Sequence, residues 1–135
     1  MNAKTLIGGL IGGVVFFLLG WLLFGILLAD MMAAHSNMSC MRPMADMNMM
    51  LMVAANLLWG ITFAYIFAKA NIMGFGAGAT QGAIIAILSG LTMDLFLYCT
   101  TTLYPDMTTL GIDIPLNAIT GAIGGGVIGW WFGRK

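Results

Sequence analysis

Residues 74–104 read GFGAGATQGAIIAILSGLTMDLFLYCTTTLY, a largely apolar stretch that is the strongest indicator of the fold class. The stretch exceeds the roughly 20 residues that a helix needs to cross a bilayer. It nevertheless carries a carboxyl group, Asp94, near its middle. A charged side chain at such a depth is costly, so it normally faces protein or water and has a partner. Asp94 is therefore the first candidate functional residue.

The whole chain has the composition of an integral membrane protein. Of its 135 residues, 61% are hydrophobic and 7% are charged, whereas soluble domains carry about 25% charged residues. The formal net charge is zero and no basic patch is present, which excludes nucleic-acid binding as the function. The length allows a single domain with a few spans and little outside them.

Four apolar segments predict an all-α membrane domain. They are unbroken runs rather than the alternating segments of a barrel, and each is long enough to cross a bilayer. A long loop separates the first two spans, and short connections predict antiparallel neighbours in an up-down-up-down four-helix bundle. The predicted spans are residues 5–29, 49–68, 76–103 and 114–132, with the long loop at 30–48.

The positions of the cations predict the orientation of this bundle. With four spans, one side receives Lys4, Lys69, Arg134 and Lys135, and the other side receives Arg42. Lys and Arg gather on the cytoplasmic side of membrane proteins. We therefore expect both termini in the cytoplasm of a bacterium, the chain in the inner membrane, and the long loop on the outer side.

Glycines recur at four-residue spacing in three of the predicted spans. Small residues at positions i and i+4 form a flat helix face that lets two backbones approach closely. Such faces can pack the helices within one bundle, or they can form an interface between copies of the chain. The expected packing residues are Gly8, Gly12, Gly74, Gly78, Gly82, Gly121, Gly125 and Gly129.

A polar stripe predicts an intramembrane site around Asp94. Asp94, Tyr98 and Thr101 share one helix face, because residues three and four apart are neighbours on a helix. Asn56 of the second span is expected in the same half of the membrane. The group either lines a proton or cation site, or holds the helices together through a protonated Asp94 that donates to Asn56 or Tyr98. The two interpretations differ in whether water reaches the site.

The long loop contains a second candidate site, for a metal. Its candidate ligands are His35, Met38, Met41 and Met44, whose imidazole and thioether groups suit Cu(I) better than hard ions. Methionine is also a general filler of irregular apolar surfaces. Copper binding and simple apolar packing therefore both remain open.

Other chemistry has little support in the sequence. No Gly-x-Ser-x-Gly, His-Glu-x-x-His or phosphate-loop motif is present, so we expect no enzyme activity and, apart from copper, no cofactor. Cys40 and Cys99 either form a disulfide on the oxidising side of the membrane or remain free thiols.

Three segments resemble a group of small four-span bacterial membrane proteins known only as a domain of unknown function. The segments are IGGVVFFLLGW at 11–21, GAII at 82–85 leading to DLFLY at 94–98, and GGGVIGW at 124–130. The resemblance extends over nearly the whole chain. It implies a four-helix inner-membrane protein, and it implies no activity, ligand or catalytic residue.

Three functions follow as expectations. The first is an oligomeric channel or transporter-like protein with its polar site around Asp94. The second is a structural or accessory subunit that packs against a larger membrane complex through its glycine-rich faces. The third is a periplasm-facing Cu(I)-binding protein. The expected partners are the lipid bilayer and either further copies of the chain or a larger membrane complex.

Overall fold

The computed structural model describes residues 2–27, 48–104 and 107–134. Within these ranges the protein is helical and contains no strand. Four of its helices are long and apolar enough to cross a membrane. The predictions of an all-α fold and of four membrane-compatible helices are therefore confirmed.

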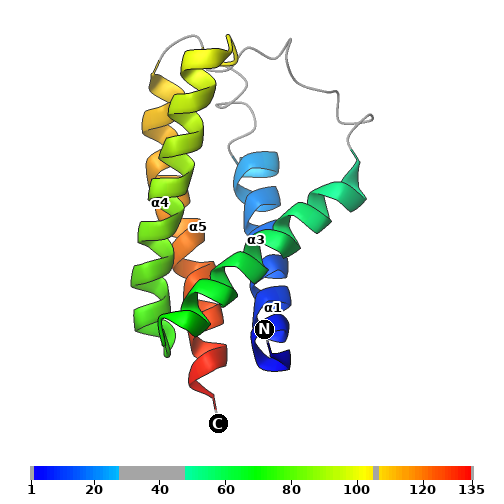
Figure 1. Ribbon diagram of the computed structural model, residues 1–135. Coiled ribbons are helices and arrows are strands. Elements are labelled where there is room, and N and C mark those ends of the chain that lie inside the picture. Colours follow the sequence, from blue (N-terminus) through cyan, green and yellow to red (C-terminus); the bar gives the residue numbers. More distant parts are fainter. Residues whose placement is uncertain (1, 28–47, 105–106, 135) are drawn as a thin grey trace.

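The helices follow one another along the chain with short connections between the last three (Figure 1). Asparagine side chains cap the first two long helices: Asn2 accepts a hydrogen bond from the Thr5 amide at 2.8 Å, and Asn48 accepts one from the Leu51 amide at 3.2 Å. The elements are α1 (Ala3–Gly20), the π-helix η1 (Trp21–Leu27), α3 (Met49–Lys69), α4 (Phe75–Thr100) and α5 (Thr108–Gly133).

The long helices form two antiparallel pairs, α1 with α3 and α4 with α5. In Figure 1, α3 crosses α1 obliquely, whereas α4 and α5 lie side by side over most of their length. Gly9 packs against Ile61 and Gly13 against Leu57, so α1 and α3 run in opposite directions. Helix α5 also packs against α1 and joins the two pairs.

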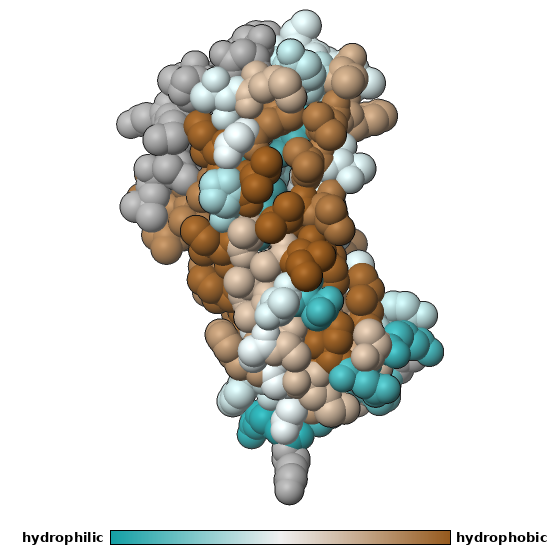
Figure 2. Space-filling view, turned by 90° about the vertical axis from the view of Figure 1, so that its left-hand side faces the viewer, coloured by the Kyte–Doolittle hydropathy of each residue, from teal (hydrophilic) through white to brown (hydrophobic). Residues whose placement is uncertain are grey.

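The buried core lies where α1, α3 and α5 meet. Phe63 of α3 is completely buried and packs edge-on against Phe16 of α1, with 5.0 Å between the ring centroids. The same cluster also contains Ala64, Phe67, Ala86, Ile128 and Phe132. The outer surface is also apolar, and the face in Figure 2 is hydrophobic over most of its middle, with hydrophilic residues gathered mainly towards its lower end. Apolar surface on the outside is what a helix bundle in lipid requires.

Helix α5 begins earlier than the sequence predicted. The expected start was residue 114, but the helix begins at Thr108, and Pro115 lies inside it. Proline removes one backbone hydrogen bond, and its ring crowds the carbonyl four residues earlier. That earlier residue is Gly111, which is exposed, and the helix continues through the proline to Gly133. The earlier start places Asp113 inside a helix rather than in a loop.

Candidate functional site

Asp94 is buried against α5, and part of its carboxyl group has no partner. The residue is only 6% exposed. Its Oδ1 accepts a long hydrogen bond of 3.5 Å from the hydroxyl of Tyr104, in the connection after α4. Its Oδ2 is buried and has no hydrogen-bond partner among the described residues. A buried polar atom without a partner is rare in proteins and often marks a functional site.

A second carboxyl group faces Asp94 from α5. The carboxyl of Asp113 lies within hydrogen-bonding reach of the Asp94 carboxyl. Asn117, one helical turn after Asp113, donates its Nδ2 to Asp113 Oδ2 at 3.1 Å. The site is therefore a pair of carboxyl groups, in which the phenol of Tyr104 bonds to Asp94 and the amide of Asn117 bonds to Asp113.

The antiparallel register of α4 and α5 produces this pairing. Glycines allow the two backbones to touch, so that a Cβ atom on Gly82 would lie 2.8 Å from the Cα atom of Gly125. Every fourth residue of α4 then meets every fourth residue of α5 in reverse order. The opposed pairs are Gly78 with Gly129, Gly82 with Gly125, Ala86 with Gly121, Gly90 with Asn117, and Asp94 with Asp113.

Gly90 makes room for the amide that positions Asp113. A Cβ atom on Gly90 would lie 2.7 Å from the side-chain Cγ of Asn117, closer than real Cβ contacts allow. Because residue 90 lacks a side chain, the amide of Asn117 can lie against α4 one turn before Asp94. Gly90 thus belongs to the site although it carries no functional group.

The described cations lie far from the carboxyl pair. Lys4 donates to backbone carbonyls of Phe132 and Arg134 at the end of α5, whereas Asp113 lies near the beginning of that helix. As a scale for such a pair, two unit charges of the same sign at a separation of about 4 Å repel each other by roughly 4 kcal/mol at an effective dielectric constant of 20. The pair therefore favours any state in which a proton or a cation compensates one of the two charges.

Tyr104 remains a hydrogen-bond donor at neutral pH. Burial, followed by the charges of Asp94 and Asp113, raises the pKa of Tyr104 to about 12. The phenol therefore keeps its proton across the physiological range, so it can donate to Asp94 Oδ1 but cannot take a proton from the pair.

The other residues expected at this site lie elsewhere or bond differently. Asn56 donates to the carbonyl of Met52 on its own helix at 2.8 Å. Thr101 donates to the carbonyl of Leu97 at 2.6 Å, and Tyr98 is 37% exposed. The structure places Tyr104 and Asp113 beside Asp94, and neither of these two residues was in the expected group of Asn56, Tyr98 and Thr101.

A repeat in the sequence could have identified the second carboxyl group. On α4 the four-residue spacing of glycines continues through Gly90 to Asp94, and on α5 it runs back from Gly121 through Asn117 to Asp113. The predicted fourth span begins at residue 114, which leaves Asp113 in the predicted connection and therefore does not indicate a helix turn formed by Asp113 and Asn117.

The expected packing glycines lie between helices of the same chain. Gly78 and Gly82 of α4 pack against Gly121, Gly125 and Gly129 of α5. In α1, Gly8 lies against Trp131 and Gly12 lies against Ile128. Gly74 precedes α4 with φ at +93°, which favours glycine, and its amide donates to the Gly129 carbonyl at 2.8 Å.

The expected copper ligands and one of the two cysteines lie outside the described residues. These are His35, Met38, Met41, Met44 and Cys40. Within the described ranges, no group of three or more His, Cys, Asp or Glu side chains is arranged to hold a metal ion. Cys99 is exposed near the end of α4.

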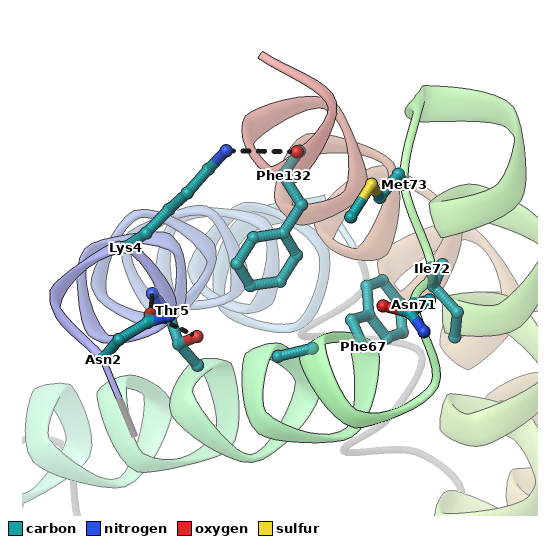
Figure 3. Close-up of a pocket in the computed structure, with 9 residues that line it drawn as sticks. Asn2, Lys4, Thr5, Phe67, Asn71, Ile72, Met73 and Phe132 are labelled. Atoms are coloured by element: carbon teal, nitrogen blue, oxygen red, sulfur yellow. Dashed lines mark hydrogen bonds between the residues drawn. The ribbon is translucent and has the colours of Figure 1, made fainter. Parts of the chain in front are cut away.

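A separate pocket of about 170 Å³ lies at the opposite end of the bundle, near the two termini (Figure 3). Lys4 borders it and donates to the carbonyls of Phe132 at 3.3 Å and Arg134 at 2.9 Å. The indole of Trp131 donates to the Lys4 carbonyl at 2.9 Å. These bonds join the beginning of α1 to the end of α5, and two of them use the ammonium group of Lys4, the cation among the described residues that line the pocket.

Comparison of the chain with known protein families, with curated proteins and with solved structures finds no match.

Proposed function

We propose that this protein is a small transport protein or channel of the bacterial inner membrane, in which Asp94 binds the proton or cation that is moved. One observation carries the proposal: Asp94 is buried in a membrane-compatible helix with an unpartnered oxygen. Ionisable groups at such positions usually mark ion pathways or proton relays.

The proposal includes an up-down-up-down arrangement with both termini in the cytoplasm. The bias of Lys and Arg towards one side supports this orientation. Arg134 lies 5.1 Å from the ring centroids of both Trp130 and Trp131, and such a combination of a cation with tryptophans is typical of a membrane interface. In this orientation the carboxyl pair lies in the periplasmic half of the membrane.

The proposal also includes a homo-oligomer. Helix α4 packs mainly on α5, and its other faces expose Leu88, Met93 and Phe96. The α4–α5 pair alone does not enclose a pathway for ions across the membrane. A second copy of the chain would enclose the side of the pathway next to the carboxyl pair.

The two other expected functions have less support. An accessory subunit was expected to bind its complex through free glycine faces, but the expected glycines pack within the chain. Copper binding rests on residues outside the described ranges. An enzyme remains unsupported, since no catalytic motif accompanies the carboxyl pair.

The test is a flux assay on purified protein in liposomes that contain a pH-sensitive dye. A potassium diffusion potential should drive protons or cations inward, and Asp94→Asn should reduce the rate at least tenfold because the amide cannot bind a proton. The control is Thr62→Val in α3, an exposed residue whose hydroxyl bonds to the Leu58 carbonyl of its own helix at 2.9 Å; it should retain the normal rate. Equal rates for Asp94→Asn and the unchanged protein, or no flux with any cation tested, would contradict the proposal.

A further inference from the structure

We propose that Asp94 and Asp113 hold a single proton between them, so that the ligand of this site is H⁺ rather than a metal cation. This inference rests on the proposed transport function and specifies the ion that the site binds. It assigns Asp113 a direct part in binding, alongside Asp94.

The contact between the two carboxyl groups requires a proton. An ionised carboxylate can only accept hydrogen bonds, whereas a protonated carboxyl group donates one. Asp94 and Asp113 lie within hydrogen-bonding reach of each other, and the Oδ2 atom of Asp94 is buried with no described donor. One proton between the two groups supplies the missing donor.

Two neutral donors at the site have fixed positions. Tyr104 donates to Asp94 Oδ1 at 3.5 Å, and Asn117 donates to Asp113 Oδ2 at 3.1 Å. Each carboxyl group therefore has one oxygen oriented by a neutral donor. The titratable groups that face Asp94 are Asp113 from α5 and Tyr104 from the connection between α4 and α5. The described cations of α1, α3 and α5 lie at the other end of the bundle.

The available oxygen atoms suit a proton better than a metal ion. Hard cations such as Ca²⁺ and Mg²⁺ take about six to eight oxygen ligands. The described residues at the pair offer two carboxyl groups, one long phenol contact and an amide whose nitrogen faces Asp113. This described set is too small to complete the ligand shell of Ca²⁺, whereas a shared proton needs only two oxygens.

The experiment is infrared difference spectroscopy on the whole protein in hydrated lipid films at neutral pH. A protonated carboxyl group has a C=O stretching band that ionised carboxylates lack, and the band shifts in deuterated water. The unchanged protein should show this band. Both Asp94→Asn and Asp113→Asn should lose it, with at least a tenfold fall in area, because the new amide donates to the remaining carboxylate and replaces the proton.

Each result has a defined meaning. Absence of the band in the unchanged protein would overturn the proposal, and so would its survival in Asp113→Asn, which would mean that Asp94 holds the proton alone. Loss of the band on adding sodium, lithium or calcium salts would identify a metal cation as the ligand. Circular dichroism and gel filtration check that the variants are folded. If a variant does not fold, the infrared spectrum of the unchanged protein still tests the proposal.

The infrared spectra test the shared proton and the flux assay tests the transport function, so each proposal can be rejected while the other is retained. A shared proton without any flux would retain this inference and reject the transport function. Flux that depends on Asp94, together with a band that persists in Asp113→Asn, would retain the transport function and reject the sharing.

Discussion

At the scale of single residues, the neighbours of Asp94 decide its chemistry. A phenol donates to one oxygen of Asp94, and a second carboxyl group lies beside the residue. Asn117 does not touch Asp94 in any described bond but orients Asp113. The site therefore consists of two acids, each with one neutral donor.

The titration of Tyr104 reports the charge of this pair. We expect Tyr104 to titrate with a pKa of about 12, above the ordinary value of about 10. In Asp94→Asn its pKa should fall, because a nearby negative charge no longer opposes ionisation of the phenol. The fall should be incomplete, since burial is the largest cause and remains.

The measurement is the ultraviolet absorbance of tyrosinate as the pH rises, with Tyr104→Phe subtracted to remove the signals of Tyr65 and Tyr98. An unchanged Tyr104 titration in Asp94→Asn would show that the two side chains are not electrostatically coupled.

At the scale of elements, backbone contact between α4 and α5 brings the site together. Glycines at every fourth position permit this contact. The same register continues from the glycines to the carboxyl pair, so a change in helix spacing at Gly82 would be transmitted along about three turns of helix to Asp94. Packing and the functional site are therefore coupled in this helix pair.

We expect Gly82→Ala to destabilise the protein by about 1–3 kcal/mol, the usual range for overpacking a close contact. The new Cβ atom would lie 2.8 Å from the Cα atom of Gly125 and would also crowd the carbonyl of Gly121. Backbone atoms cannot move aside as a flexible side chain can, so the two helices must separate.

The matched control is Gly76→Ala in the same helix, where a Cβ atom meets nothing within 4 Å. It should be neutral or stabilising by up to about 1 kcal/mol. Reversible unfolding in mixed detergent micelles measures both free energies. Equal effects of the two substitutions would contradict the close packing at Gly82.

At the scale of the whole molecule, the two ends of the bundle differ in charge. Lys4, Lys69 and Arg134 lie at the end where the chain termini meet (Figure 1). The carboxyl pair lies towards the opposite end, since about 9 Å of helix separates Asp94 from the end of α4 at Thr100. This polarity underlies the proposed orientation in the membrane.

Cysteine labelling tests the orientation. In a protein whose Cys40 and Cys99 are replaced by serine, Met107→Cys should react with a membrane-impermeant maleimide in bacteria whose outer membrane has been opened. Asn71→Cys, at the other end, should react only after the inner membrane is also lysed. Both residues are exposed, so access to the solvent does not bias the comparison. The reverse pattern would place the termini in the periplasm.

Much of the fold was predictable from hydrophobicity alone. The four helices follow from the lengths of the apolar runs, because a backbone in lipid must satisfy its hydrogen bonds within each helix. The second helix illustrates this, with a predicted range of 49–68 against an observed one of Met49–Lys69. The start of α5 was not predicted, because the fourth apolar run was taken from residue 114, whereas the helix begins at Thr108 and contains both Asp113 and Pro115.

The candidate site, like the fold, was predictable from the sequence only in part. The importance of Asp94 followed from its chemical type within an apolar run, because burying a charge has a high cost wherever the helix packs. Its partner Asp113 did not follow, since Asp113 is distant along the chain and meets Asp94 only through the antiparallel register of α4 and α5. That register depends on which glycines touch, and helix-to-helix contact is a property of the assembled bundle that neither helix contains alone.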